Sequence, residues 1–122
     1  MLSFPASLGI WLCTRPADMR RSFDGLAEMV RQHLNRDPLS GQLFVFRNKR
    51  SDRVKLLCWE EDGFLIVYKR LEEGQFQFPA APANGDAGVT MRAADLMMLL
   101  DGVDWQNAKR SKRYRRPEAT PA

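Results

Sequence analysis

The fold of this chain is decided by residues 42–79, QLFVFRNKRSDRVKLLCWEEDGFLIVYKRLEEGQFQFP. Segments rich in branched and aromatic residues alternate here with short polar turns, as expected of β-strands. The predicted strands are 43–46, 53–60, 64–70 and a shorter edge segment, 75–78. Asp62-Gly63 is typical of a hairpin turn, because such turns need positive φ. The stretch therefore predicts an antiparallel β-meander.

Alternation within the longest predicted strand separates its side chains between two faces. Val54, Leu56 and Cys58 fall on one face, whereas Lys55, Leu57 and Trp59 fall on the other.

The segments on either side of the meander complete a small domain. Residues 8–13 form a further predicted strand, and Thr14 with Pro16 gives a helix-start signal. The helix is predicted from Pro16 to about Asn35, with apolar residues at spacings of three and four. That stripe comprises Met19, Phe23, Leu26, Ala27, Val30 and Leu34. Thr90 is a candidate cap for a second, short helix, predicted to span 91–101.

The predicted fold class is α+β: a small antiparallel sheet packed against one long helix, with a short C-terminal helix. At 122 residues the chain is expected to hold one domain, residues 1–105. Within it, residues 79–89 are rich in Pro, Ala and Gly and predict a flexible loop. Residues 106–122 are expected to be a disordered basic tail.

Charge is distributed unevenly along the chain. Residues 1–108 hold 13 Lys or Arg against 14 Asp or Glu, whereas residues 109–122 hold six Lys or Arg and one Glu. The net charge of +4 therefore arises in the tail. Such a tail suits a polyanion, although a solvated terminus that aids solubility explains it equally well. No apolar run approaches the roughly 20 residues of a membrane span, and no secretory signal is recognised, so we expect a cytoplasmic protein.

The residues that catalysis requires are sparse. His33 is the sole histidine and borders the apolar stripe of the predicted helix, and the two cysteines, Cys13 and Cys58, lie in strand-like segments as reduced core thiols. The acidic clusters 60–62 and 72–73 fall at predicted turns, where solvated charge is the usual explanation. No glycine-rich phosphate loop or GxSxG motif is present. We therefore expect no metal site, no cofactor and no enzymatic activity.

The remaining candidate for function is the first turn of the meander and the chain near it. Five basic residues fall within nine positions there, and two more end the next strand, as a β-ribbon that tracks DNA phosphates would have them. Phe64, Trp59 and Tyr68 lie nearby and could stack on bases if exposed, although core packing is their stronger interpretation. The alternative to DNA contact is that these basic residues lie in a solvated turn and bind no ligand. The predicted DNA-binding residues are Arg47, Lys49, Arg50, Arg53, Lys55, Lys69 and Arg70, together with Lys109, Arg110, Lys112, Arg113, Arg115 and Arg116 of the tail.

An ordered series of segments resembles a known family. The segments are Ile10-Trp11-Leu12, DMRRSFDGLA at 18–27, DPLSG at 37–41, LFVFRNKR at 43–50, DRVKLL at 52–57, DGF at 62–64, YKRLE at 68–72 and LLDGVDW at 99–105, with Pro5, Trp59, Gly74, Phe76 and Pro79 between or beside them. Together they are similar to the TnpB accessory proteins of the IS-sixty-six group of bacterial insertion sequences, the products of a second reading frame. The resemblance covers roughly residues 5–105.

The resemblance implies a role in DNA transposition beside a separate, larger transposase, and it carries over no catalytic residues. Combined with the charge pattern, it leads us to expect a non-enzymatic accessory protein that binds DNA and works with the transposase or other proteins of the same element. The alternative is a protein-interaction module that recruits or regulates the transposase through an apolar surface, with Trp105 and Met97-Met98 as candidate contacts. A third hypothesis is a metal-dependent nuclease. The sequence does not determine the oligomeric state of the protein.

Overall fold

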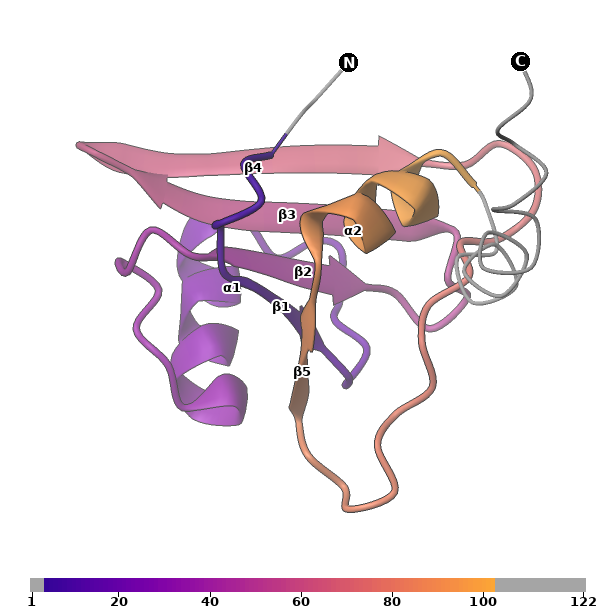
Figure 1. The fold of residues 1–122 in the computed structure, drawn as a ribbon, viewed down its shortest axis with the longest axis horizontal. Helices are drawn as coiled ribbons and strands as arrows, with labels where there is room; N and C mark the ends of the chain where they lie inside the picture. The colour runs from indigo at the N-terminus through magenta and orange to yellow at the C-terminus, as the bar shows by residue number, and fades with distance from the viewer. Residues whose placement is uncertain (1–3, 103–122) are drawn as a thin grey trace, which may run out of the picture.

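A computed structural model describes residues 4–102, and these residues are built around one mixed β-sheet (Figure 1). Its strands are β1 (Ile10–Cys13), β2 (Leu43–Arg47), β3 (Arg53–Glu60), β4 (Gly63–Arg70) and β5 (Gly88–Met91). The strand order across the sheet is β4-β3-β2-β1-β5. The central β2–β3–β4 meander is confirmed, with antiparallel pairing at both of its junctions.

The prediction of a purely antiparallel sheet is wrong at β1. This strand pairs in parallel with β2, with Ile10 opposite Leu43, and antiparallel with β5. A parallel neighbour requires a crossover connection, because the chain must return to the same end of the sheet. The crossover between β1 and β2 contains α1 (Phe23–Met29) and a short π-helix, η1 (Val30–Leu34).

The helical segment is shorter than predicted, because residues 16–22 remain outside it. Thr14 does not cap a helix; its hydroxyl donates to the carbonyl of Asp86 at 3.0 Å. The carbonyl oxygens of Met19 and Arg21 accept hydrogen bonds from the Lys55 ammonium, each at 2.7 Å. Carbonyls used in this way are not available for the first helical turn, so the helix begins at Phe23.

The C-terminal half of the fold also differs from the prediction. The chain forms β5 at Gly88–Met91, partly inside the predicted loop, and Thr90 lies in this strand rather than at a helix cap. Gly88 permits the close approach, because a Cβ atom there would lie 2.6 Å from Leu34 Cδ2. Residues 75–78 form no strand; Phe76 is instead buried in the core. The second helix, α2, runs from Ala93 to Leu100 and confirms the predicted short helix.

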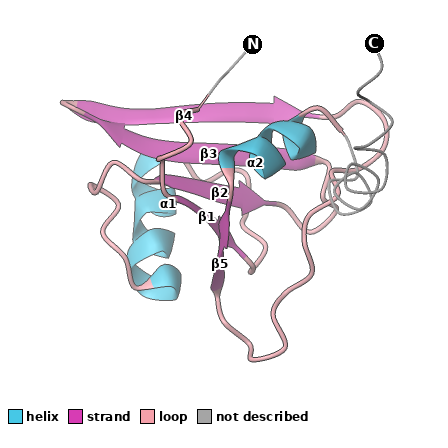
Figure 2. Cartoon of the chain, viewed as in Figure 1, coloured by secondary structure: helices cyan, strands magenta, loops and turns pink. Residues whose placement is uncertain are grey.

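Side chains from opposite faces of the sheet form two separate hydrophobic clusters. Alternation along β3 is confirmed: Val54, Leu56 and Cys58 pack on the side of α2, and Leu57 packs on the side of α1. α2 lies in front of the sheet in Figures 1 and 2, and α1 packs on the opposite face, since its buried residues Leu26, Ala27 and Met29 belong to the other cluster. The sheet is therefore a middle layer with apolar packing on both sides.

None of the helices within residues 4–102 is long and apolar enough to cross a membrane. The predicted tail, 106–122, lies outside the described residues.

Candidate nucleic-acid-binding surface

The turn between β2 and β3 is held in shape by the side chain of Asn48. Its Oδ1 accepts a hydrogen bond from the backbone N–H of Arg53 at 3.0 Å, and its Nδ2 donates to Asp52 Oδ1 at 2.6 Å. Ser51 completes the turn with a φ of 59°. Because both ends of the turn are fixed, Lys49 and Arg50 lie at its exposed tip.

Asp52 places a negative charge beside these cations. Its hydrogen bond from Asn48 lowers the pKa of the carboxyl group, and the nearby charges of Arg50 and Arg53 lower it further. The carboxylate therefore stays ionised at neutral pH and offsets part of the positive charge of the turn.

A loop that lies far away in sequence faces this turn. In residues 16–20, Asp18 accepts hydrogen bonds from the guanidinium of Arg20, the shortest at 2.6 Å, and from its backbone N–H at 2.9 Å. The side-chain bond from Arg20 is the main cause that lowers the pKa of Asp18 to about 2. Sequence reasoning missed this loop, because its position beside the turn follows from the crossover and from the Lys55 contacts.

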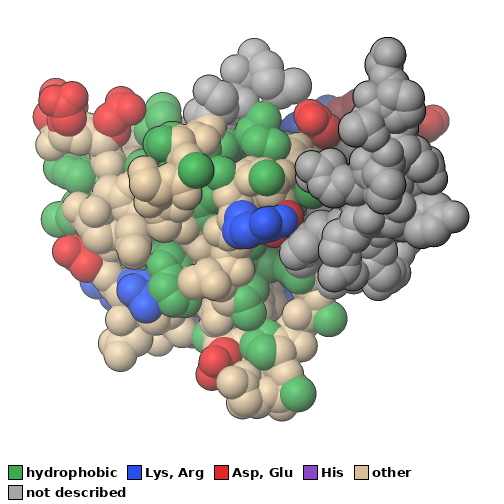
Figure 3. Space-filling model, in the orientation of Figure 1, with side chains coloured by type: hydrophobic (Ala, Val, Ile, Leu, Met, Phe, Trp, Pro, Cys, Tyr) green, Lys and Arg blue, Asp and Glu red, His purple; other side chains and the backbone are tan. Residues whose placement is uncertain are grey.

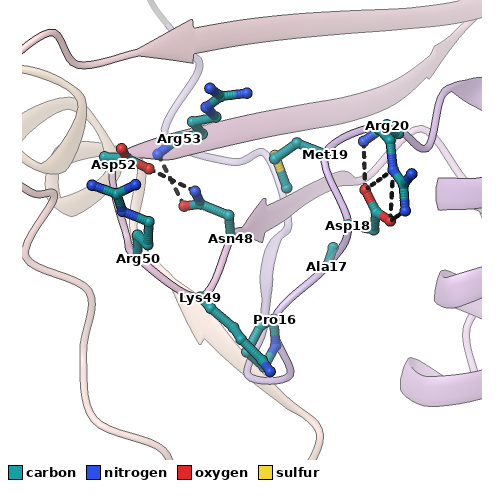
Figure 4. Close-up of a pocket in the computed structure, with 10 residues that line it drawn as sticks. All are labelled: Pro16, Ala17, Asp18, Met19, Arg20, Asn48, Lys49, Arg50, Asp52 and Arg53. Carbon is teal, nitrogen blue, oxygen red and sulfur yellow. Dashed lines mark hydrogen bonds and ion pairs between the residues drawn. The ribbon is translucent and has the colours of Figure 1, made fainter.

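The β2–β3 turn and the loop 16–20 line an open pocket of about 570 Å³ (Figure 4). Lys49, Arg50 and Arg53 come from the turn side, and Arg20 comes from the loop side with its carboxylate partner Asp18. The pocket thus has a basic lining on which two carboxylates are interspersed.

Three of the predicted DNA-binding residues donate hydrogen bonds to main-chain carbonyls within the fold. Lys55 is only 7% exposed, and besides its two carbonyl partners its ammonium lies 4.6 Å from the ring centroid of Tyr68. Arg47 Nη2 donates to the carbonyl of Thr14 at 3.0 Å. Lys69 Nζ donates to the carbonyl of Leu100 at 2.6 Å, at the C-terminal end of α2, where a positive charge is favoured. These cations are used in folding contacts.

The other predicted cations within residues 4–102 do not bond to distant carbonyls; Lys49, Arg50 and Arg70 are exposed and Arg53 is partly exposed. Among residues 4–102, the side chains of Lys49 and Arg50 form no ion pair or hydrogen bond. Arg53 and Arg70 lie directly opposite each other in the β3–β4 register. Opposed like charges destabilise a strand pair, and the exposed ion pair of Arg70 with Glu72, at 2.9 Å, relieves this only in part.

An aromatic ring lies next to this pair of arginines. Tyr68 is 46% exposed, and its hydroxyl accepts a hydrogen bond from Arg53 Nη1 at 3.2 Å. By contrast, Trp59 and Phe64 pack edge to face, with ring centroids 5.0 Å apart, at the other end of the same two strands. Of the three aromatic residues considered from the sequence, Tyr68 is therefore the one beside exposed cations.

Lys49, Arg50, Arg53 and Arg70, with Tyr68, are named here the basic rim. The face that carries α2 shows Lys and Arg side chains as isolated spots among hydrophobic and neutral surface (Figure 3). The predicted tail residues Lys109, Arg110, Lys112, Arg113, Arg115 and Arg116 lie outside the described part of the chain.

The residues with catalytic or metal-binding chemistry are spread over the fold. Cys13 is buried and Cys58 partly buried, both are free thiols, and burial is the main cause that raises the pKa of each. His33 is partly buried and lies 3.4 Å from Arg15 Nη1 through its Nδ1 atom. Within residues 4–102, no three His, Cys, Asp or Glu side chains gather closely enough to hold a metal ion.

The fold and the basic rim define a small α+β domain, with a mixed sheet whose β2–β3 turn presents exposed cations. Comparison with known proteins then gives the family. Residues 8–110 match the model of the IS66 Orf2 like protein family, TnpB of the IS66 insertion sequences. The chain belongs to this family and is thus an accessory protein of an insertion sequence.

Two proteins of Sinorhizobium fredii are similar along nearly their whole length. y4jC is 37% identical over 117 residues, which cover 96% of this chain and 97% of the relative. y4hO is 33% identical over 113 residues, which cover 93% of this chain and 96% of the relative. Neither relative's name states an activity. No solved structure matches the chain.

Proposed function

We propose that this protein is a non-enzymatic accessory factor of transposition that binds DNA through the basic rim. Family membership provides the context of an insertion sequence, in which DNA is the common substrate of the machinery. The observation that carries the proposal is the direct opposition of Arg53 and Arg70 beside Lys49 and Arg50, whose side chains form no ion pair within residues 4–102. A strand pair that keeps like charges together loses stability, and a polyanion would relieve the repulsion.

The expected contacts are with the phosphate backbone. Lys49 and Arg50 extend from a rigid turn, and Arg53 and Arg70 share one face of the β3–β4 ribbon. Such contacts position a protein on DNA without reading its sequence. Tyr68, exposed next to Arg53, offers a surface on which an unpaired base can stack. The basic tail supplies the long-range attraction, since the rest of the chain is close to neutral.

The test is the salt dependence of DNA binding by the full chain, measured by fluorescence anisotropy on duplex and single-stranded DNA. Replacing Lys49, Arg50, Arg53 and Arg70 with Ala should reduce affinity by about 100-fold. It should also reduce the slope of log K against log salt by about one for each lost phosphate contact. Arg31→Ala, which removes an exposed cation of the π-helix η1, is the matched control for Arg50→Ala.

Two results would reject the basic rim as the DNA-binding surface. The first is an unchanged affinity and salt slope in the fourfold variant. The second is an equal loss of affinity in Arg31→Ala and Arg50→Ala, which would show that net charge alone matters. A chain ending at Ala108 separates the rim from the tail, because the rim should leave a measurable salt slope in the truncated protein.

The transposase of the same element is the protein partner we propose. Of the candidate contacts, Met97 and Met98 are partly buried on α2, and Trp105 lies outside the described residues. Co-purification of the two proteins after nuclease treatment tests this partnership without DNA. Loss of the complex after nuclease treatment would mean that DNA bridges them.

A further inference from the structure

Within residues 4–102, the outer edge of β4 is the longest open strand edge. β4 is last in the strand order, and among residues 4–102 no strand pairs with its outer side. Its eight residues pair with β3 in unbroken register from Arg53↔Arg70 to Glu60↔Gly63, so no bulge interrupts it. The opposite edge, β5, has only four residues. Protein sheets protect open edges with charged side chains, proline, bulges or short strands, and of these devices β4 has only the charges of Lys69 and Arg70 at its end.

The side chains of this edge are unusually apolar for a solvent-exposed strand. Leu65 is 49% exposed and Tyr68 is 46% exposed, on opposite faces of the sheet. An exposed, regular and apolar edge strand is the form of surface to which another strand adds by main-chain hydrogen bonds.

The two ends of β4 carry opposite charges. Glu60 ends β3, Glu61 and Asp62 form the turn that leads into β4, and Lys69 and Arg70 end β4. Figure 3 shows Asp and Glu side chains gathered at the upper left, where Figure 1 places the β3–β4 turn. A strand that is negative at its beginning and positive at its end is complementary to an antiparallel copy of itself.

We propose that a second copy of this chain adds to the β4 edge, antiparallel and about a two-fold axis through Ile66. A two-fold axis perpendicular to a sheet places its central residue opposite its own copy. With Ile66 at the centre, Asp62 lies opposite Arg70 of the second copy, and Phe64 lies opposite Tyr68 of the second copy. Leu65 then lies opposite Val67. In this register an acidic residue is paired with a basic residue at each end of the strand pair, and aromatic and aliphatic residues are paired in its middle.

The register with its axis on the next residue, Val67, pairs the side chains less well than the register centred on Ile66. An axis through Val67 would place Phe64 opposite Arg70 of the second copy and Leu65 opposite Lys69. That arrangement sets charged residues against apolar ones and leaves Asp62 without a basic partner. Of these two registers the charge pattern favours the axis through Ile66, in which two five-stranded sheets join into one continuous sheet.

Sedimentation velocity of the full chain without DNA tests the dimer over a wide concentration series. The expected result is a mass that rises from one chain to two with concentration. Leu65→Glu should weaken self-association at least tenfold, because it places charge in the middle of the new strand pair. Leu39→Glu is the matched control, since Leu39 is also exposed, at 46%, but lies in the loop before β2. A monomer at every concentration, or equal association in both variants, would overturn the proposal.

A charge exchange tests the register. Asp62→Arg and Arg70→Asp should each weaken association about tenfold, because each creates two like-charge pairs across the two-fold axis. The double variant should recover wild-type association. Within one chain the two positions are eight residues apart along an extended strand, roughly 26 Å, so recovery must come from contact between copies. A double variant that self-associates no more tightly than the single variants would exclude this register. Since DNA is absent, the result is independent of the proposed DNA binding.

Discussion

Lys55 and Lys49 lie six positions apart in the chain, yet the fold uses them in opposite ways. Lys55 projects under the loop 16–22 and donates hydrogen bonds to two carbonyls, whereas Lys49 stands at the exposed tip of a turn. Arg47 and Arg53 repeat the contrast: the first holds Thr14, and the second faces outward beside Tyr68. A dense run of basic residues is therefore two groups, one that stabilises the crossover and one that is free to bind a ligand.

The largest effect expected from this contrast is on stability. Lys55→Met keeps most of the aliphatic stem but removes the ammonium, which leaves the carbonyls of Met19 and Arg21 without their donor. We expect the free energy of unfolding to fall by about 2 kcal/mol, because two partly buried carbonyls lose a charged donor and a hydrogen bond to a charged group contributes about 1.5–3 kcal/mol. Lys49→Met should change it by less than about 0.5 kcal/mol, as an exposed substitution usually does. Urea unfolding followed by circular dichroism measures both, and similar values for the two variants would contradict the division into two groups.

A second pair of variants should separate stability from binding. Arg47→Ala removes the hydrogen bond to Thr14 and should lower the free energy of unfolding by about 1–2 kcal/mol. Arg53→Ala should leave stability nearly unchanged, since it also removes the repulsion with Arg70, and should weaken DNA binding by about 5-fold. Urea unfolding and anisotropy on the same preparations test the pair. A larger loss of DNA affinity in a folded Arg47→Ala protein would reverse the assignment.

The smallest effect concerns the loop that faces the turn. The pKa of Asp18 is lowered from 3.8 to about 2 in the folded chain, chiefly by the hydrogen bonds from Arg20. A lowered pKa adds stability that is present above the unfolded value and is lost as pH falls from about 4 towards 2. Asp18→Asn should therefore unfold slightly more easily at pH 7 and lose less stability over that acid range. Melting temperatures of the two proteins at pH 7, 4 and 2.5 measure this difference. If both melting temperatures fall equally with pH, the Asp18 carboxylate does not contribute to stability in this way.

The antiparallel hairpins show how far local pattern predicts this fold. The β2–β3–β4 meander and the two faces of β3 follow from alternating apolar residues. The predicted Asp62-Gly63 turn is displaced by one residue: Glu61 and Asp62 form it, the positive φ of 53° is at Glu61, and Gly63 begins β4. The crossover helix was predicted too early, because the apolar stripe continues back to Met19 and gives no sign that Lys55 holds that residue's carbonyl. β5 was missed because Gly88–Met91 is short and follows a Pro- and Gly-rich stretch.

Sequence alone determined the family, the central meander and the position of the basic turn, because each depends on residues that are neighbours in the chain. Tertiary structure decided which cations make contacts that hold distant parts of the fold together. Arg47, Lys55 and Lys69 reach carbonyls that lie 31 to 36 residues away. It also decided the parallel pairing of β1 with β2 and the open edge of β4. Neither local propensity nor charge pattern encodes such distant neighbours, since they are set by how the crossover and the two apolar faces pack together.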